Sequence, residues 1–155
     1  MKNIVFILII LFGAITTLKA DVKKWKLEQA GFLNIDRNEK DYGGFSGLLI
    51  NNAGTEALVV TDKSFFFVLE LRRDDNDILT GYSAIKKGRI LSSKGEHLNG
   101  RNTDSESIAM DANNNYYISF ESNHRIMMHT EVEGKGIFVP KHPMFRKLSV
   151  NKGIE

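Results

Sequence analysis

The chain has 155 residues, no cysteine and a formal net charge of +2 at pH 7. The absence of cysteine excludes disulfides, thiolate metal sites and cysteine nucleophiles. Two of the 21 basic residues, Lys2 and Lys19, fall among the first 20 residues, which leaves 19 basic against 19 acidic residues beyond them. No run of five like charges occurs, so binding to nucleic acid or to an anionic membrane has no electrostatic support.

The first 20 residues have the pattern of a secretory signal peptide. Lys2 provides a positive start, residues 4–12 form an unbroken apolar run, and Ala20 precedes Asp21. The run is too short to span a bilayer comfortably, which takes about 20 apolar residues. We expect cleavage after residue 20 and no stable membrane span afterwards, with an uncleaved anchor as the alternative. An exported chain without disulfides favours a periplasmic or secreted location.

After a polar stretch over 21–42, the chain predicts a first set of antiparallel strands. Gly43-Gly44 marks a bend or a close backbone approach, and two β-rich runs joined by an Asn/Gly turn follow. Residues 64–71 contain three consecutive phenylalanines, which are too apolar for a solvated strand and belong in a buried sheet. The expected strands are 45–51, 56–61, 64–71 and one or two within 78–91, with turns at 52–55 and 74–77.

A second unit resembles the first. Residues 104–121 loosely repeat residues 43–62, because both have a small-residue entry, an apolar strand, a polar turn and a second apolar strand. A polar loop over 92–103 separates the two units. The strands expected in the second unit are 105–111, 116–121, 125–131 and 136–139.

The repeat predicts an all-β fold of antiparallel four-stranded, blade-like units. Such units stack because none buries its apolar face alone, and four strands is the number in each blade of a β-propeller. A third copy begins near 151–155, where the sequence ends. We therefore expect residues 21–155 to form a partial β-propeller domain of about two and a half blades, apparently truncated at its C-terminus. Its last sheet edge would be open to association.

Asp104 and Glu106 are the first candidates for chemistry. Residues two apart in an extended strand point the same way, so both carboxylates would share a face. Paired carboxylates bind a divalent cation, or one serves as a base beside the other. The alternative is a pair of solvated acids at the end of a loop.

Glu121 and Arg125 flank a predicted hairpin turn, close enough to pair. The pair would orient an anionic group or would simply brace the turn. Asp62 ends the corresponding strand of the first unit, where Glu121 stands in the second. An acid that recurs at one strand end indicates a shared role, although aspartate is also a favoured turn residue.

Other polar motifs favour simpler interpretations. We expect surface or turn histidines rather than a metal set from His97, His124, His129 and His142. The segment starting at Asp111 predicts a plain β-turn, because a calcium loop requires Gly at its sixth position and Glu at its twelfth, and this chain has neither. The sequence contains no GxSxG elbow, no P-loop and no HExxH motif.

Five segments together resemble the phytase-like family, which is associated with esterase-like activity. They are GGFSGL, VVTDKS, DSESIAMD, YYISFE followed by Arg125, and the terminal NKGIE. The resemblance extends from about residue 40 to residue 155 and corresponds to the N-terminal half or less of a typical member. It implies an exported bacterial protein with a β-propeller fold.

The family pattern is carried over residue by residue. Its acid-bearing strand end matches Asp62, followed here by Lys63-Ser64 where Arg-Gly is more usual, and its D-x-E-G motif is matched with Ser107 in place of the glycine. The remaining matches are Gly44, Ser46 and Gly47 in the opening, Asp104 and Glu106 in D-x-E, Ser119, Glu121 and Arg125 in S-x-E then Arg, and Asn151, Gly153 and Glu155 in N-x-G-x-E.

The resemblance implies hydrolysis of a phosphoric or carboxylic ester at the axis of the propeller. Carboxylates would hold a water or a divalent cation such as calcium, and Arg125 would hold the anion. The implied catalytic residues are Asp104, Glu106, Glu121 and Arg125; the substrate-binding residues are Asp62, Asn151 and Glu155; and the metal ligands are Asp104 and Glu106. The alternatives are a non-catalytic periplasmic module that binds a ligand or protein partner, and a truncated, inactive product.

Overall fold

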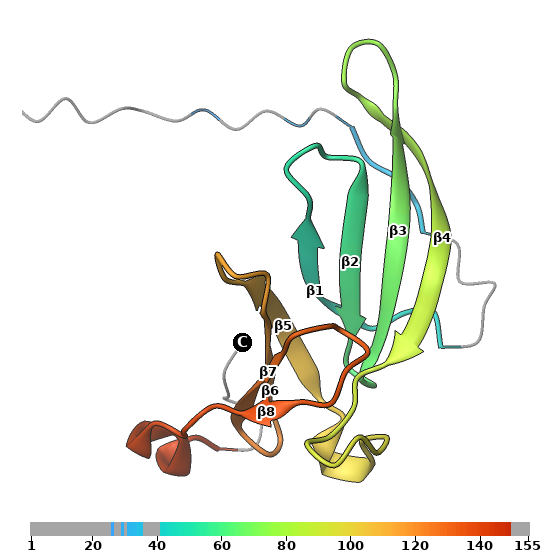
Figure 1. The fold of residues 1–155 in the computed structure, drawn as a ribbon. Helices are drawn as coiled ribbons and strands as arrows, with labels where there is room; N and C mark the ends of the chain where they lie inside the picture. The colour runs from blue at the N-terminus through green and yellow to red at the C-terminus, as the bar shows by residue number, and fades with distance from the viewer. Residues whose placement is uncertain (1–25, 27–28, 30, 36–40, 150–155) are drawn as a thin grey trace, which may run out of the picture.

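The computed structural model describes residues 26, 29, 31–35 and 41–149 (Figure 1). The predicted signal peptide and the predicted site residues Asn151 and Glu155 lie outside these residues. Within the described part, no helix is long and apolar enough to cross a membrane.

The structure is all-β, as predicted, with two four-stranded antiparallel sheets in sequential strand order. The first sheet contains β1 (Phe45–Ile50), β2 (Glu56–Thr61), β3 (Phe65–Arg73) and β4 (Leu79–Arg89). The second contains β5 (Ser105–Met110), β6 (Tyr116–Phe120), β7 (Arg125–His129) and β8 (Ile137–Phe138). Two short 3₁₀ turns, η1 (Gly100–Asn102) and η2 (Pro143–Lys147), are the helical elements of the described residues. Residues 78–91 thus hold one strand, not two.

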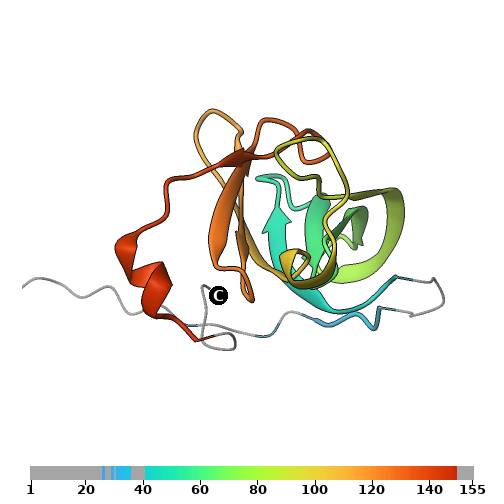
Figure 2. The same cartoon turned by 90° about the horizontal axis from the view of Figure 1, so that it is seen from below.

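The two sheets face each other across a shared core. Figures 1 and 2 show β1 and β5 as the neighbouring strands, with β4 and β8 toward the outside. Side chains of β2 and β3 meet those of β5, β6 and β7, and the loops between strands close the ends. This core contains Leu58, Val60, Phe66, Ile90, Leu98, Ile108, Ile118, Phe120, Met127 and Val132.

The first sheet is apolar on its other face as well. Successive strand residues point to opposite faces, so Phe66 enters the core between the sheets while Phe65 and Phe67 point away from it. The second cluster consists of Tyr42, Ala57, Val59, Phe65, Phe67 and Leu69. The run of three phenylalanines therefore lies in a buried sheet, as predicted.

The turns that join the first two strands of each sheet are built alike. The Oδ1 atom of Asn51 accepts hydrogen bonds from the backbone N–H groups of Thr55 (2.9 Å) and residue 56. The Oδ1 atom of Asp111 accepts from Asn113 and Asn115, both at 2.9 Å. A further hydrogen bond from the side-chain amide of Asn115 is the main reason that the pKa of Asp111 lies below its ordinary value. The prediction of a plain turn at Asp111 is confirmed.

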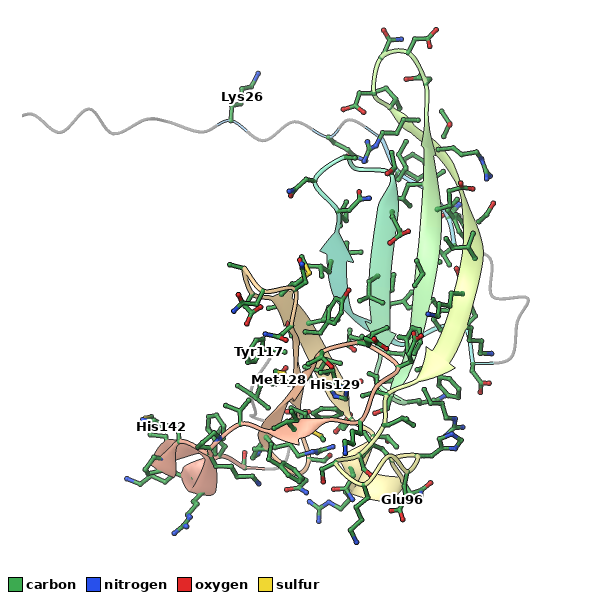
Figure 3. The ribbon with its side chains drawn as sticks, in the orientation of Figure 1. Lys26, Glu96, Tyr117, Met128, His129 and His142 are labelled. Atoms are coloured by element: carbon green, nitrogen blue, oxygen red, sulfur yellow. The ribbon has the colours of Figure 1, made fainter. Side chains whose placement is uncertain are left out.

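The prediction of surface or turn histidines is wrong for His129, while His124 lies in the turn before β7, as predicted, although its side chain is buried. His124 is buried, and its Nε2 lies 3.0 Å from the carbonyl oxygen of Ser149. His129 is 0% exposed, and its Nδ1 lies 2.9 Å from the carbonyl oxygen of Gly134. His129 alternates with Arg125 and Met127 along β7, and this face of the strand turns toward the first sheet (Figure 3).

The burial of His129 predicts a pH-dependent stability. Burial lowers the pKa of His129 below its ordinary 6.5. When the pH falls below about 6.5, His129 is protonated in the unfolded chain but stays neutral in the folded chain. The free energy of unfolding therefore decreases by up to about 1.4 kcal/mol per pH unit. Denaturant titrations at pH 7.5 and 5.5 measure this loss. His129→Leu, which copies the equivalent Leu69 of β3, should reduce the loss, whereas His97→Leu at an exposed position should not. An equal loss in wild type and His129→Leu would contradict this assignment.

Candidate functional site

A bulge near the start of β1 shapes the end of the first sheet. Phe45 lies opposite Thr61 and Gly47 lies opposite Val60, so Ser46 is an extra residue in β1. A bulge of this kind turns one side chain out of the regular alternation of the strand. The Ser46 hydroxyl donates to the carbonyl oxygen of Ser105 at 2.5 Å, which joins β1 to the start of β5.

The same bulge recurs in β5 and carries Glu106. Ser105 lies opposite Phe120 and Ser107 lies opposite Ser119, so Glu106 occupies the position that Ser46 has in β1. The repeat seen in the sequence is therefore a repeat of backbone register. Because of the bulge, Glu106 is the one residue of β5 that has no paired residue opposite it in β6.

Three carboxylates converge at this end of the second sheet. Oxygen atoms of Asp104, Glu106 and Glu121 all lie within 4.8 Å of one another, and all three side chains are half-buried. The backbone N–H of Glu121 donates to the carbonyl oxygen of Asp104 at 2.8 Å, which fixes the two residues side by side. The Ser122 hydroxyl donates to Oδ2 of Asp104 at 2.5 Å. Three hard oxygen donors at this spacing suit a divalent cation, which offsets their mutual repulsion.

Asp62 occupies the position of Glu121 in the first sheet. Its backbone N–H donates to the carbonyl oxygen of Gly44 at 2.9 Å, as that of Glu121 donates to Asp104. Gly44 has φ +63°, and a Cβ there would lie 2.3 Å from Oδ1 of Asp62, so only glycine fits beside this carboxylate. Oδ1 of Asp62 is buried and has no hydrogen-bond partner within the described residues.

Serine hydroxyls bring the two sheet ends together. Ser105 donates to the carbonyl oxygen of Thr61 at 2.5 Å, and Ser64 donates to the carbonyl oxygen of Thr103. Because Thr61 precedes Asp62 and Ser105 stands between Asp104 and Glu106, these bonds place the acids of both sheets along one seam. The sequence gives no signal for these serines, since nothing local distinguishes a serine that bonds across sheets from a turn serine.

Arg125 is held by the backbone around it. It is 3% exposed, its guanidinium lies 3.8 Å from the centre of the Phe120 ring, and its two terminal nitrogens donate to the carbonyl oxygens of Asn102 (2.5 Å) and Asn123 (3.0 Å). Burial lowers the pKa of Arg125 to about 10, so it is charged at neutral pH. These contacts support the bracing alternative, because Arg125 joins the η1 loop to the turn that carries Glu121.

The fold and the acid cluster define an all-β protein of two repeated sheets with a carboxylate-rich site at their seam. A family model described as phytase-like, esterase-like activity of phytase, matches residues 40–155. The chain therefore belongs to the phytase-like family, which confirms the resemblance found in its sequence. No curated protein and no solved structure matches the chain.

Proposed function

We propose that this protein is an exported hydrolase of phosphoric or carboxylic esters. The observation that carries the proposal is the convergence of Asp104, Glu106 and Glu121 within 4.8 Å, in a chain of the phytase-like family. Export rests on the sequence of the first 20 residues. A periplasmic or secreted location, a small ester substrate and the absence of a nucleic-acid partner are parts of the same proposal.

The proposed architecture places this site on the axis of a β-propeller. Two consecutive sheets with the same register, and with their first strands adjacent, support an interpretation as successive blades. In that arrangement the ends of β1 and β5 face the axis, and so do Asp62 and the three clustered acids. Asn151 and Glu155 would belong to the start of the next blade.

The chemistry follows from the residue types. Asp104, Glu106 and Glu121 would hold a divalent cation such as calcium, which when bound polarises an ester oxygen and offsets the charge that develops there. Glu106, on the bulge, would be the carboxylate that accepts a proton from water. Asp62 would contact the substrate from the first sheet. Arg125 keeps the turn of Glu121 in place and adds a positive charge that favours an anionic substrate.

A hydrolysis assay of the exported chain tests the proposal. We expect turnover of phytate or of a nitrophenyl ester, and a decrease in kcat of about 10²–10⁴-fold for Glu106→Gln, which keeps the shape of the side chain but removes its basicity. Glu96→Gln, on a surface loop labelled in Figure 3, should leave kcat unchanged. Absence of turnover on both substrate types, or equal activity in the two variants, would exclude this hydrolase.

The second candidate is a non-catalytic module that binds a ligand or partner. It is favoured by Arg125, whose guanidinium is buried and bonded to two backbone carbonyls and is therefore poorly placed to receive a substrate anion. A module of this kind would use the acid cluster to bind a cation without hydrolysing an ester.

Calcium binding at the acid cluster should be visible in thermal melts under either candidate. A cation at a hundred times its Kd stabilises the folded state by about 2.7 kcal/mol, so the melting temperature should rise with added calcium. Glu121→Gln should abolish most of this rise while Glu96→Gln retains it. A calcium-dependent rise without any ester turnover would favour the binding module, and an unchanged rise in Glu121→Gln would place the cation elsewhere.

A further inference from the structure

A pocket of about 440 Å³ lies at the C-terminal end of β4, the edge strand of the first sheet (Figure 1). We call it the β4 pocket, and its lining consists of Phe65, Lys87, Gly88, Arg89, Leu91 and His97. Three of these residues are basic, and none of the described lining residues is acidic. Because positively charged walls attract anions, the β4 pocket is suited to an anionic ligand.

The pairing of β3 with β4 brings two of the cations to one aromatic ring. Lys87 and Arg89 are two residues apart in β4, so their side chains lie on the same face of the sheet. Arg89 lies opposite Phe65, and its guanidinium carbon is 4.4 Å from the centre of the Phe65 ring. The ammonium nitrogen of Lys87 is 5.5 Å from the centre of the same ring. The two positive charges repel each other, and an anion bound beside both would offset this repulsion.

The guanidinium of Arg89 has N–H donors that the protein leaves unused. The side chain is half-buried, yet it makes no hydrogen bond or ion pair with any residue that the structure describes. Arg72 and Arg125, by contrast, donate to backbone carbonyl oxygens. The imidazole of His97 also has no hydrogen-bond partner in the described part of the chain. Both groups can therefore donate to a ligand in the β4 pocket.

Lys87 is partly neutralised by Asp41. Its ammonium nitrogen lies 3.4 Å from Oδ2 of Asp41, and the two side chains are 37% and 31% exposed. An ion pair with this exposure is weak, so the lysine can also contact a ligand. Asp41 does not line the pocket. It would compete with a bound anion for Lys87, and its removal should therefore strengthen anion binding.

We propose that the β4 pocket binds a phosphate group, either as inorganic phosphate or as a phosphate monoester. Arg89 supplies a planar fork that matches two phosphate oxygens, and Lys87 supplies a point charge. A phosphate monoester has a charge of about −1.5 to −2 at pH 7, which two cations balance better than they balance a single carboxylate. Phe65 and Leu91 would contact the organic part of an ester. The pocket shares no residue with the acid cluster, so this proposal does not depend on ester hydrolysis.

Isothermal titration calorimetry of the exported chain tests the proposal, with EDTA present so that no cation at the acid cluster binds phosphate. The probes are inorganic phosphate and phenylphosphonate, which has an anionic head on an aromatic ring and no ester bond to hydrolyse. We expect saturable binding. Arg89→Gln should weaken the affinity about tenfold, the effect of losing a charge-assisted contact. Arg146→Gln, the same charge change at an exposed position of η2, should leave the affinity unchanged.

Asp41→Asn tests the proposal in the opposite direction. Asparagine tolerates the positive φ of 76° at this position, so the backbone is retained. With the competing charge removed, the phosphate affinity should increase about threefold. Tighter binding of phenylphosphonate than of phosphate would identify a monoester as the ligand, and equal affinity would identify free phosphate. The proposal is overturned if phosphate does not bind up to about 10 mM, or if Arg89→Gln and Asp41→Asn both bind it as the wild type does.

Discussion

Replacing Gly47 with valine should separate the two sheets. A Cβ at Gly47 would lie 2.7 Å from Cγ2 of Val60, 2.9 Å from the backbone nitrogen of Ile108 and 3.0 Å from the backbone carbon of Ser107. Two of these atoms belong to the backbone of β5, which gives way only if the second sheet moves. We expect a loss of about 3 kcal/mol in the free energy of unfolding, the upper range for an overpacked core.

The equivalent position in the second sheet is a matched control. Ser107 occupies the position of Gly47 in the repeated register and already carries a Cβ. Ser107→Ala should change the free energy of unfolding by about 0.5 kcal/mol or less. Urea denaturation followed by circular dichroism measures both variants. Unfolding of Gly47→Val at the same urea concentration as Ser107→Ala would contradict the close approach of β1 to β5.

The Gly47→Val substitution should also disturb the candidate site, through the serine hydrogen bonds that join the ends of the two sheets. The Ser46–Ser105 and Ser105–Thr61 hydrogen bonds join the bulge of β1 to the residues beside Asp104 and Asp62. A displaced β5 lengthens both bonds. Calcium stabilisation should therefore be weaker in Gly47→Val than in Ser107→Ala, even at temperatures where both are folded.

Local patterns were sufficient to predict the strands. The hairpin turns at Asn51 and Asp111 are specified by side chains that bond their own backbone, and the run of phenylalanines at 65–67 requires a sheet covered on both faces. These features depend on neighbours within a few residues. The recurrence of an acid at the ends of β2 and β6 was visible for the same reason.

Features that depend on strand register or on contacts between residues far apart in the sequence were not predictable. The bulge at Glu106 is defined by the pairing of Ser105 and Ser107 with β6, which no local pattern encodes. The burial of His129 was missed because both faces of β7 carry apolar residues, so alternation does not tell which face is inside. The sequence also left two roles open for Arg125, and its partners decide between them.

Replacing Arg125 with alanine should destabilise the fold more than it alters the chemistry. The change leaves the carbonyl oxygens of Asn102 and Asn123 without their donor and opens a cavity against the Phe120 ring. The loss of hydrogen bonds from a charged donor and a large-to-small change at a buried position each cost on the order of 1–3 kcal/mol, so we expect a total loss of about 3–5 kcal/mol. Thermal and urea denaturation measure this loss directly.

Arg125→Lys separates bracing from catalysis. Lysine keeps the charge but has no planar fork, so it reaches one of the two carbonyls and retains part of the stability. If Arg125 is a positioning residue, the folded Arg125→Lys protein should keep its KM, because the side chain does not contact the substrate. Its kcat should decrease only to the extent that the turn carrying Glu121 becomes less ordered. A large rise in KM with an unchanged melting temperature would instead assign Arg125 to direct binding of the substrate anion. Since Arg125 has its pKa near 10, these assays belong between pH 7 and 8, where its charge is constant.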